Sequence, residues 1–255
     1  MAGAALPGRL IWRVGTVVGL RDETATARTI ALDVKGWPGH IAGQHVDVRL
    51  TAADGYSSVR SYSIASAPNL GTVVELTIER LPDGEVSPYL TRELAVSDPL
   101  ELRGPIGAWF VWRPQQTEPV QLVAGGSGVV PLMAMVRSRA SSGSMAPFRL
   151  LYSLREPAAT FYKMEFEELS KSDQDGPVNV TYAYTRATPD GWPRPPGRID
   201  GALIARSTWA SHLAPTSYVC GPTSFVEQAA SLLIAAGHNP DRIRTERFGP
   251  TGERR

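Results

Sequence analysis

The chain has 255 residues, of which 42% are hydrophobic, and its formal net charge is +1. This composition is sufficient for the packed core of one large domain or two ordinary ones, and it is not typical of a disordered chain. The nearly neutral charge gives no reason to expect nucleic acid or an anionic membrane as a partner.

A single cysteine, Cys220, and four scattered histidines limit the metal chemistry of the chain. One thiol cannot form a disulfide within the chain or hold a cysteine-ligated iron–sulfur cluster. The histidines have no metal-ligand spacing, so we expect surface or satisfied histidines and no metal site. They are His40, His45, His212 and His238.

The first ten residues lack a basic start followed by an apolar run, and no stretch reaches the length of a membrane span. We therefore expect a soluble, cytoplasmic protein that does not contact a membrane. Nothing in the sequence demands more than a monomer, and it contains no internal repeat.

The first hundred residues read as short strands separated by Gly, Pro and Asp. About six strands at this spacing predict a small antiparallel β-barrel. One helix is expected before the last strand, because Ser87 is a plausible N-cap and Pro88 suits the first helical position. The expected strands are Ile11–Leu20, Thr26–Val34, His45–Leu50, Ser58–Ile64, Val73–Arg80 and Asp98–Arg103.

The fourth of these strands carries side chains suited to a flat ring joined to a phosphate. Tyr62 offers a π surface for stacking, and Ser63 offers a hydroxyl to a ring nitrogen. Arg60 offers a fork of donors to a phosphate group. On this segment alone, an ordinary solvent-exposed strand is the simpler interpretation.

The helix expected at Ser87 is, after Arg60, a second feature that could bind phosphate. Helix N-termini bind phosphate through unpaired N–H groups and the helix dipole. A capped connector without a ligand is the alternative interpretation.

A change of pattern follows the barrel region. The polar, proline-flanked segment 113–119 predicts a linker, and we place the two domains at residues 1–114 and 115–255. Three aromatic residues just before the linker are expected to pack between the domains. They are Trp109, Phe110 and Trp112.

After the linker, short apolar runs alternate with helical stretches, which predicts a doubly wound α/β domain with a parallel sheet. The expected strands are Val120–Ala124, Phe148–Leu154, Val178–Thr185, Ser217–Val219 and Ile243–Phe248. The expected helices are Val129–Val136, Phe161–Leu169, Gly201–Ala205 and Thr223–Ala236.

A glycine turn follows the first strand of this second domain. Gly126 and Gly128 allow the backbone to approach a pyrophosphate, although Pro131 replaces the third glycine of the usual dinucleotide fingerprint. A serine hydrolase elbow at Ser127 is the alternative. Val129 stands where that motif needs glycine, which weighs against it.

Six segments resemble motifs of the ferredoxin–NADP reductase family, in the family's order, and the resemblance covers nearly the whole chain. It implies an FAD-binding β-barrel domain and an NAD(P)-binding α/β domain, without an iron–sulfur domain. The segments are Arg60-Ser61-Tyr62-Ser63, Gly84-Glu85-Val86-Ser87, Gly104-Pro105-Ile106-Gly107, Gly125–Pro131, Cys220-Gly221-Pro222 and Glu246-Arg247-Phe248.

The resemblance also implies a role for each matching residue. FAD would contact Arg60, Ser61, Tyr62, Ser63, Thr77, Ile78, Glu79, Gly84, Val86, Ser87, Ser127 and Phe248. NADP would contact Gly126, Ser127, Gly128, Ser153, Arg155, Tyr162, Thr185, Arg186, Cys220, Gly221 and Pro222. The reacting rings would meet between the catalytic residues Ser63, Cys220 and Glu246. The extension after Phe248 leaves open whether that ring covers the flavin as it does in family members that end there.

The choice of nicotinamide cofactor depends on charge near the adenosine ribose. Thr185 and Arg186 resemble the family's clamp for the 2′-phosphate, whereas a free ribose diol prefers a carboxylate. Glu156 stands just past the second strand, where such an acid would favour NADH. We expect NADPH, with NADH as the alternative.

These features predict an FAD-dependent NAD(P)H oxidoreductase that passes electrons to a separate redox partner, such as ferredoxin, flavodoxin or an oxygenase component. A flavin reductase with a small-molecule acceptor and a non-catalytic nucleotide-binding subunit are the alternatives.

Overall fold

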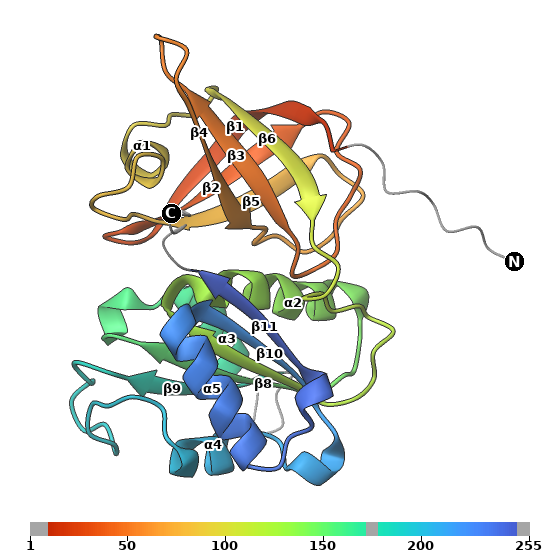
Figure 1. Cartoon of the computed structure of the whole chain (residues 1–255), viewed down its shortest axis with the longest axis vertical. Coiled ribbons are helices and arrows are strands. Elements are labelled where there is room, and N and C mark those ends of the chain that lie inside the picture. The colour runs from red at the N-terminus through yellow and green to blue at the C-terminus, as the bar shows by residue number, and fades with distance from the viewer. Residues whose placement is uncertain (1–9, 172–177, 249–255) are drawn as a thin grey trace, which may run out of the picture.

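The computed structural model describes residues 10–171 and 178–248, in which a β-domain lies against an α/β domain (Figure 1). Six strands of the β-domain form an antiparallel sheet in the order β4-β3-β6-β1-β2-β5. The two end strands are bridged at Ile64 and Leu76, which closes the sheet into the expected barrel. The strands are β1 (Trp12–Thr24), β2 (Ala27–Val34), β3 (His45–Thr51), β4 (Ser57–Ser63), β5 (Val73–Glu79) and β6 (Pro99–Ile106).

The barrel is filled by the inward-facing apolar residues of its strands, since side chains alternate across a strand. In β2, for example, Ile30, Leu32 and Val34 are fully buried. The short helix α1 (Ser87–Arg92) covers one end of the barrel and contributes Leu90 to the same core.

The start of α1 differs from the sequence-based expectation. Val86 is the N-cap residue, and Ser87 is already the first helical residue. The hydroxyl of Ser87 accepts a hydrogen bond from the backbone N–H of Leu81 at 3.0 Å, so it stabilises the preceding turn and does not cap the helix. The prediction that Ser87 is the N-cap was wrong because this turn competes for its hydroxyl.

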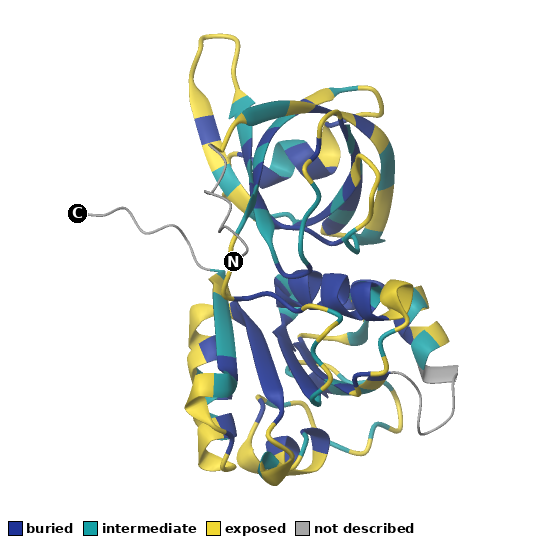
Figure 2. Ribbon diagram, turned by 90° about the vertical axis from the view of Figure 1, so that its right-hand side faces the viewer, coloured by how far each residue is buried: buried dark blue, intermediate teal, exposed yellow. Residues whose placement is uncertain are grey.

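The second domain is the predicted α/β domain with a five-stranded parallel sheet in the order β11-β10-β7-β8-β9. Its strands are β7 (Val120–Gly125), β8 (Phe148–Leu154), β9 (Val178–Tyr184), β10 (Thr216–Pro222) and β11 (Ile243–Phe248). Its helices are α2 (Val129–Ser142), α3 (Lys163–Lys171), α4 (Gly201–Ser207) and α5 (Thr223–Ala235). The central strands are buried on both faces, as a parallel sheet covered by helices requires (Figure 2).

Helix α2 lies between the barrel and the parallel sheet (Figures 1 and 2). Ten of its 14 residues are buried, because one side packs on the sheet and the other on the barrel. Phe110 and Trp112 are buried in the same core cluster, as expected. Trp109 is 61% exposed, so its predicted packing role was wrong; the Arg244 guanidinium lies 5.3 Å from its ring centre.

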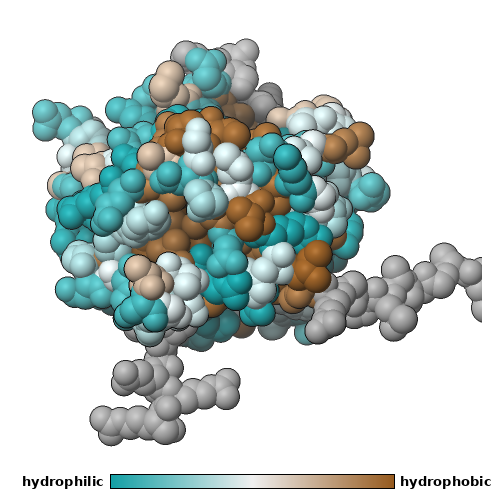
Figure 3. Space-filling model, turned by 90° about the horizontal axis from the view of Figure 1, so that it is seen from above, coloured by the Kyte–Doolittle hydropathy of each residue, from teal (hydrophilic) through white to brown (hydrophobic). Residues whose placement is uncertain are grey.

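Viewed from the barrel end, the surface mixes hydrophobic and hydrophilic side chains (Figure 3). Exposed apolar residues of the barrel include Val14, Val18 and Val96. Such side chains are common on protein surfaces and need no ligand to explain them. Among the residues the structure describes, no helix combines the length and apolar character that crossing a membrane requires.

Candidate functional site

The barrel opens along the seam between its end strands. β4 and β5 are bridged at Ile64 and Leu76, and the N–H of Ala65 donates to the carbonyl of Glu75 at 2.8 Å. Beyond this bridge, at Ser63 and in the stretch Thr77–Glu79, no backbone ladder joins the two strands among the described residues. Most of the residues predicted to hold FAD in the barrel belong to β4, to β5 or to the turn before α1 and its first residue, Ser87.

The side chains along this opening differ in what they can offer. Thr77 is buried and its hydroxyl is hydrogen-bonded, and the side chain of Ile78 is fully buried in the barrel core. Only the backbone groups of these two residues are therefore available to a ligand. Burial raises the pKa of Tyr62 to about 12, which keeps its phenol neutral. Its ring is part-buried against the barrel core.

The two phosphate-directed features lie next to each other. Arg60 contacts Glu85, in the turn before α1, at 3.4 Å between Nη2 and Oε2. Arg60 Nη1 also donates to the carbonyl of Val59 at 2.8 Å. Both side chains are substantially exposed, and the remaining guanidinium donors are available to a ligand. The backbone of Gly84, Val86 and Ser87 lies in the same turn. A pyrophosphate at this end of the opening would meet Arg60 and unpaired N–H groups of the first turn of α1.

The glycine turn lies at the point where the strand order of the parallel sheet reverses. β7 has β8 on one side and β10 on the other. Residues Gly126–Gly128 form a 3-10 turn that leads directly into α2. A side chain at Gly128 would collide with the carbonyl of Cys220, whereas Gly126 has φ +54° and open space above it. The turn therefore needs glycine at both positions and presents bare backbone where α/β sheets bind ligands.

Four polar side chains meet where β3 and β4 of the barrel face β10 and β11 of the α/β domain. Cys220 and Glu246 are direct neighbours in the parallel register. His45 and Ser63 are direct neighbours in the β3–β4 register. The contact between the two pairs is that of His45 Nδ1 with Glu246 Oε1, at 3.8 Å. We call Ser63, His45, Cys220 and Glu246 the open cluster.

The open cluster contains polar atoms that lack a partner. Ser63 Oγ and Glu246 Oε2 are two of six buried side-chain N or O atoms without a hydrogen bond in the described part of the chain. Burial raises the pKa of Glu246 to about 7, and it raises the pKa of the Cys220 thiol, with the Glu246 carboxylate adding to that rise. Buried polar groups in proteins are nearly always paired, so this arrangement fits a polar ligand inserted between the domains.

Two exposed arginines mark the carboxyl ends of β8 and β9. The backbone N–H of Arg186 donates to the carbonyl of Arg155 at 2.9 Å, which holds the two residues together. Neither side chain forms an ion pair within the described ranges. Thr185 is half-buried beside them, and Glu156 is exposed next to Arg155. Ser153 is buried within β8, opposite Gly125 of β7.

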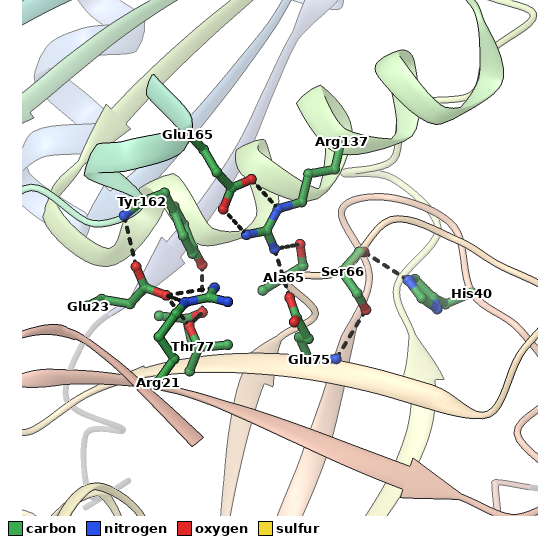
Figure 4. Close-up of polar contacts among 11 residues, drawn as sticks. Arg21, Glu23, His40, Ala65, Ser66, Glu75, Thr77, Arg137, Tyr162 and Glu165 are labelled. Carbon is green, nitrogen blue, oxygen red and sulfur yellow. Dashed lines mark hydrogen bonds and ion pairs between the residues drawn. The ribbon is translucent and has the colours of Figure 1, made fainter. Parts of the chain in front are cut away.

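Tyr162, a predicted NADP contact, lies buried between the two domains. It is 2% exposed, has φ +55° just before α3, and its hydroxyl donates to Thr77 Oγ1 at 2.6 Å. Its backbone N–H donates to Glu23 Oε2 at 3.0 Å (Figure 4). The ring is thus enclosed between the domains, and this burial does not favour the contact with NADP that the sequence predicts for Tyr162.

Arg137 of α2 completes the contact around Tyr162. Its guanidinium donates to the carbonyl of Ala65 at 2.8 Å and to Glu75 Oε2 at 3.0 Å, both in the barrel (Figure 4). It also forms a two-bond pair with Glu165 of α3, in which Nε lies 2.9 Å from Oε2. We call Arg137, Glu75, Glu165, Tyr162 and Thr77 the Arg137 clamp.

The structure places Ser63, Cys220 and Glu246 at the domain interface, and it adds two residues that sequence reasoning missed. Arg137 joins the domains, and His45 faces Glu246. His45 is the first residue of β3, but no pattern in the sequence shows that it contacts Glu246 of the other domain. Phe248 is half-buried against the core cluster that includes Cys220, and residues 249–255 lie outside the described residues.

Known relatives cover much of the chain. It is 28% identical over 209 residues to a glycine betaine monooxygenase reductase subunit of Chromohalobacter salexigens, which is 82% of this chain and 56% of that protein. It is 29% identical over 250 residues to a reductase component of the naphthalene 1,2-dioxygenase/salicylate 5-hydroxylase systems of a Ralstonia species, covering 96% of this chain and 71% of that one. The chain thus spans little more than half the length of the first relative.

Solved structures share the two-domain fold. The flavohem-like FAD/NAD-binding domain of a Vibrio cholerae nitric oxide dioxygenase has a TM-score of 0.81 at 23% identity, covering 93% of this chain and 99% of that one. A ferredoxin NADP⁺ reductase from Neisseria gonorrhoeae with bound FAD and NADP has a TM-score of 0.75 at 16% identity, covering 92% and 98%. At these identities the likeness shows the fold alone.

Two family models match successive parts of the sequence. Residues 26–111 match the oxidoreductase FAD-binding domain, and residues 122–231 match the oxidoreductase NAD-binding domain. Both lie in the order in which the barrel and the α/β domain occur here. The chain therefore belongs to the ferredoxin–NADP reductase family of FAD- and NAD-binding oxidoreductases.

Proposed function

We propose that the protein takes electrons from NADPH through FAD and delivers them to a separate redox protein. The observation that carries this proposal is the open cluster, in which two buried polar atoms from opposite domains, Ser63 Oγ and Glu246 Oε2, have no partner. When bound there, a flavin would accept hydride from the nicotinamide and return electrons to an acceptor.

The residues of the barrel fit an FAD. Ser63 Oγ is a buried donor or acceptor without a partner, as a polar ring edge requires. Tyr62 supplies a ring for stacking next to it, and Arg60 lies beside the turn before α1 at the other end of the opening. Two phosphate-directed features for one ligand favour the dinucleotide FAD over the mononucleotide FMN.

The α/β domain fits a nicotinamide nucleotide. Its bare glycine turn at Gly126 would hold the pyrophosphate, and Gly221 and Pro222 would flank the nicotinamide after β10. Cys220 and Glu246 would border the reacting ring, because they are neighbours in the sheet and face the barrel beside Ser63. The role of these residues is alignment, since hydride transfer needs donor and acceptor atoms at about 3–3.5 Å.

NADPH is the preferred nucleotide in this proposal because Arg155 and Arg186 are exposed, adjacent and without ion pairs within the described residues. Two cations at the carboxyl ends of β8 and β9 suit a 2′-phosphate. Arg186 is the preferred candidate because it directly follows Thr185, whose half-buried hydroxyl is a second possible donor. We also propose that the two domains meet at residues 114 and 115, inside the linker.

Substitution of Arg186 tests this preference. We expect Arg186→Ala to raise the KM for NADPH tenfold to a hundredfold and to leave that for NADH nearly unchanged, because a lost charge-assisted hydrogen bond is worth roughly 1.5–3 kcal/mol. Arg206→Ala, an exposed arginine in the last turn of α4, is the matched control. Equal effects of Arg186→Ala on both nucleotides would place the phosphate elsewhere, with Arg155 as the next candidate.

The acceptor is proposed to be a protein such as a ferredoxin, a flavodoxin or an oxygenase component. The relatives are named as reductase components of oxygenase systems, which supports an external partner. The one cysteine of the chain, Cys220, cannot ligate a cluster by itself, so these 255 residues supply no iron–sulfur relay to the flavin.

The experiment that tests the function is an anaerobic titration of the purified protein with NADPH and with NADH. Mass spectrometry of the released flavin should give FAD, and NADPH should bleach its absorbance. Reoxidation by ferredoxin or flavodoxin should be faster than by free flavin. Recovery of FMN alone, or a bound flavin that neither nucleotide reduces, would overturn the proposal.

A further inference from the structure

The proposed function requires two sites in different domains to meet at one separation, and this inference rests on that function. The flavin would lie along the seam between β4 and β5, and the nicotinamide nucleotide on the glycine turn before α2. Hydride transfer needs the reacting atoms at about 3–3.5 Å, and a misplacement of about 1 Å can lower the rate about a hundredfold. Contacts that join the seam to α2 therefore act on the rate even where they touch neither ligand.

Arg137 of α2 contacts the seam where it closes. Its Nη1 donates to the carbonyl of Ala65 at 2.8 Å and to Glu75 Oε2 at 3.0 Å (Figure 4). Ala65 and Glu75 are joined to each other, because the N–H of Ala65 donates to the carbonyl of Glu75 at 2.8 Å. Ala65 follows closely after Ser63 of the open cluster. One guanidinium thus holds both sides of the seam at its closed end, and only 16% of its side chain is exposed.

Tyr162 contacts the seam at a second point, further along β5. Its hydroxyl donates to Thr77 Oγ1 at 2.6 Å, and Thr77 is hydrogen-bonded to Thr29 at 2.7 Å. The Thr29 hydroxyl donates to Glu23 Oε1 at 2.6 Å, and Glu23 Oε2 accepts the backbone N–H of Tyr162 at 3.0 Å. These contacts form a closed ring that starts and ends at Tyr162 and runs through β5, β2 and β1 of the barrel.

Within the α/β domain, Arg137 and Tyr162 are held against each other. Glu165 of α3 forms two hydrogen bonds with the Arg137 guanidinium, whose central carbon lies 4.8 Å from the centre of the Tyr162 ring. Tyr162 has φ +55°, a conformation that bulky residues rarely adopt and that persists where surrounding contacts fix it. The two residues therefore present one fixed set of donors to the barrel.

Helix α2 connects these contacts to the nucleotide turn. It begins directly after Gly126–Gly128, and it carries Arg137. The barrel also packs closely on this helix, because a Cβ at Gly43 would lie 2.7 Å from the methyl carbon of Met135. Hydrogen-bond networks and regular helices carry displacements from one site to another. A shift of α2 against the barrel therefore moves the nucleotide turn relative to the seam.

We propose that Arg137 and Tyr162 are positioning residues for hydride transfer, which fix the distance between the flavin seam and the nucleotide turn. Arg137 acts through Ala65 and Glu75 on the barrel side and through α2 on the nucleotide side. No bond forms or breaks at either residue, and no proton or electron passes through them. Loosening the Arg137 clamp should therefore slow hydride transfer and leave the affinity for FAD and for NADPH unchanged.

The first test measures hydride transfer by stopped-flow absorbance in Glu75→Gln. This variant removes the charged contact between the domains and keeps the pair of Arg137 with Glu165. The limiting rate at which NADPH bleaches the flavin without oxygen should fall about tenfold. The NADPH concentration that gives half of this rate, and the FAD content, should stay at the parent values. Bleaching at the parent rate would overturn the proposal.

Glu101→Gln is the matched control for Glu75→Gln. It also removes a carboxylate that is hydrogen-bonded to an arginine, Arg49, but both residues belong to the barrel. It should bleach at the parent rate, because no contact between the domains is lost. Equal falls in Glu75→Gln and Glu101→Gln would overturn the proposal, since a lost ion pair would then lower the rate wherever it lies.

Tyr162→Phe tests the second contact. It removes the hydroxyl that reaches Thr77 and keeps the ring beside Arg137. Because the remaining contacts of the clamp are kept, the limiting rate should fall less than in Glu75→Gln, by about threefold. A parent rate in Tyr162→Phe would overturn the part of the proposal that concerns Tyr162.

A further test measures the domain geometry itself and needs no nucleotide. Spin labels at Ala53→Cys, in the β3–β4 turn, and at Ala236→Cys, after α5, give one distance across the two domains by pulsed electron paramagnetic resonance. Both positions are exposed, whereas the native Cys220 is buried. The FAD-loaded parent and Glu101→Gln should give the same narrow distribution of distances, and Glu75→Gln a broader one. An unchanged distribution in Glu75→Gln would overturn the proposal.

These measurements also distinguish this inference from the function on which it rests. A protein that neither nucleotide reduces refutes the proposed function, and the label distances then still decide whether the clamp fixes the two domains. A protein that NADPH reduces equally fast in the parent and in Glu75→Gln refutes the positioning role alone.

Discussion

The domain interface has two parts, and they use polar side chains in opposite ways. In the Arg137 clamp, buried and partly exposed polar groups are paired: Arg137 contacts Glu75 of the barrel and Glu165 of α3, and Tyr162 contacts Thr77 (Figure 4). In the open cluster, Ser63 Oγ and Glu246 Oε2 have no partner. Paired groups hold two domains in one geometry, whereas unpaired ones are costly unless a ligand satisfies them. The contrast separates the part of the interface that fixes the domains from the part that we propose binds the cofactors.

The largest effect on stability is expected from Arg137→Ala. It leaves the carboxylates of Glu75 and Glu165 without their partly buried partner, which should lower the free energy of unfolding by about 3 kcal/mol. Chemical denaturation of the purified protein measures the loss.

Arg247→Ala is the matched control for Arg137→Ala. Arg247 also forms two bonds to one glutamate, Glu227, but both side chains are largely exposed, so the loss should stay below about 1 kcal/mol. Similar losses in the two variants would show that the clamp does not hold the domains together.

The next effect is a change in how stability depends on pH. Glu246 has a folded-state pKa of about 7, above the ordinary value of 4.5, so between these values the folded protein binds more protons than the unfolded chain. Stability from this group is therefore lost as pH rises from about 4.5 to about 7, by roughly 1–3 kcal/mol.

Glu246→Gln cannot ionise and should not show this loss. Without flavin, the variant should gain stability relative to the parent between pH 5 and pH 8 in denaturation experiments. A difference that stays constant with pH would mean that Glu246 is already ionised in the folded protein.

The smallest effect is expected from Tyr162→Phe. The variant loses the 2.6 Å hydrogen bond to Thr77, but Thr77 keeps its 2.7 Å bond with Thr29. We expect a loss of about 1 kcal/mol in the free energy of unfolding. Tyr56→Phe, at an exposed tyrosine, should change it by less than about 0.5 kcal/mol. If Tyr162→Phe leaves the free energy of unfolding unchanged, the Tyr162 hydroxyl does not stabilise the clamp.

The sequence predicted the architecture well because each element carries its own local signal. Alternation and turn residues marked the barrel strands, and short apolar runs followed by helices marked the parallel sheet. Both fold types were confirmed. The interaction of Ser87 with Leu81 and the exposure of Trp109 were missed, because competing local bonds and packing at a domain edge leave no periodic signal.

Contacts between the domains were the least predictable part of the site. The resemblance implied that Tyr162 contacts NADP, whereas in the structure its hydroxyl donates to Thr77 of the barrel. His45 had no local feature that distinguished it from a surface histidine, and its contact with Glu246 exists only once the two domains are packed together. The motifs located the two halves of the candidate site, but the interface between them had to come from the structure.

The central claim is that the open cluster is the active site. The most direct test measures how fast NADPH bleaches the bound flavin without oxygen, by stopped-flow absorbance, in the parent protein and in Cys220→Ala. Cys220 is fully buried beside Glu246, and its truncation removes little volume. If the open cluster is where the nicotinamide meets the flavin, the variant should keep its FAD and its fold but bleach at least tenfold more slowly, because alignment of the reacting atoms is lost. Bleaching at the parent rate, with FAD content and stability also unchanged, would contradict the assignment of this cluster as the active site.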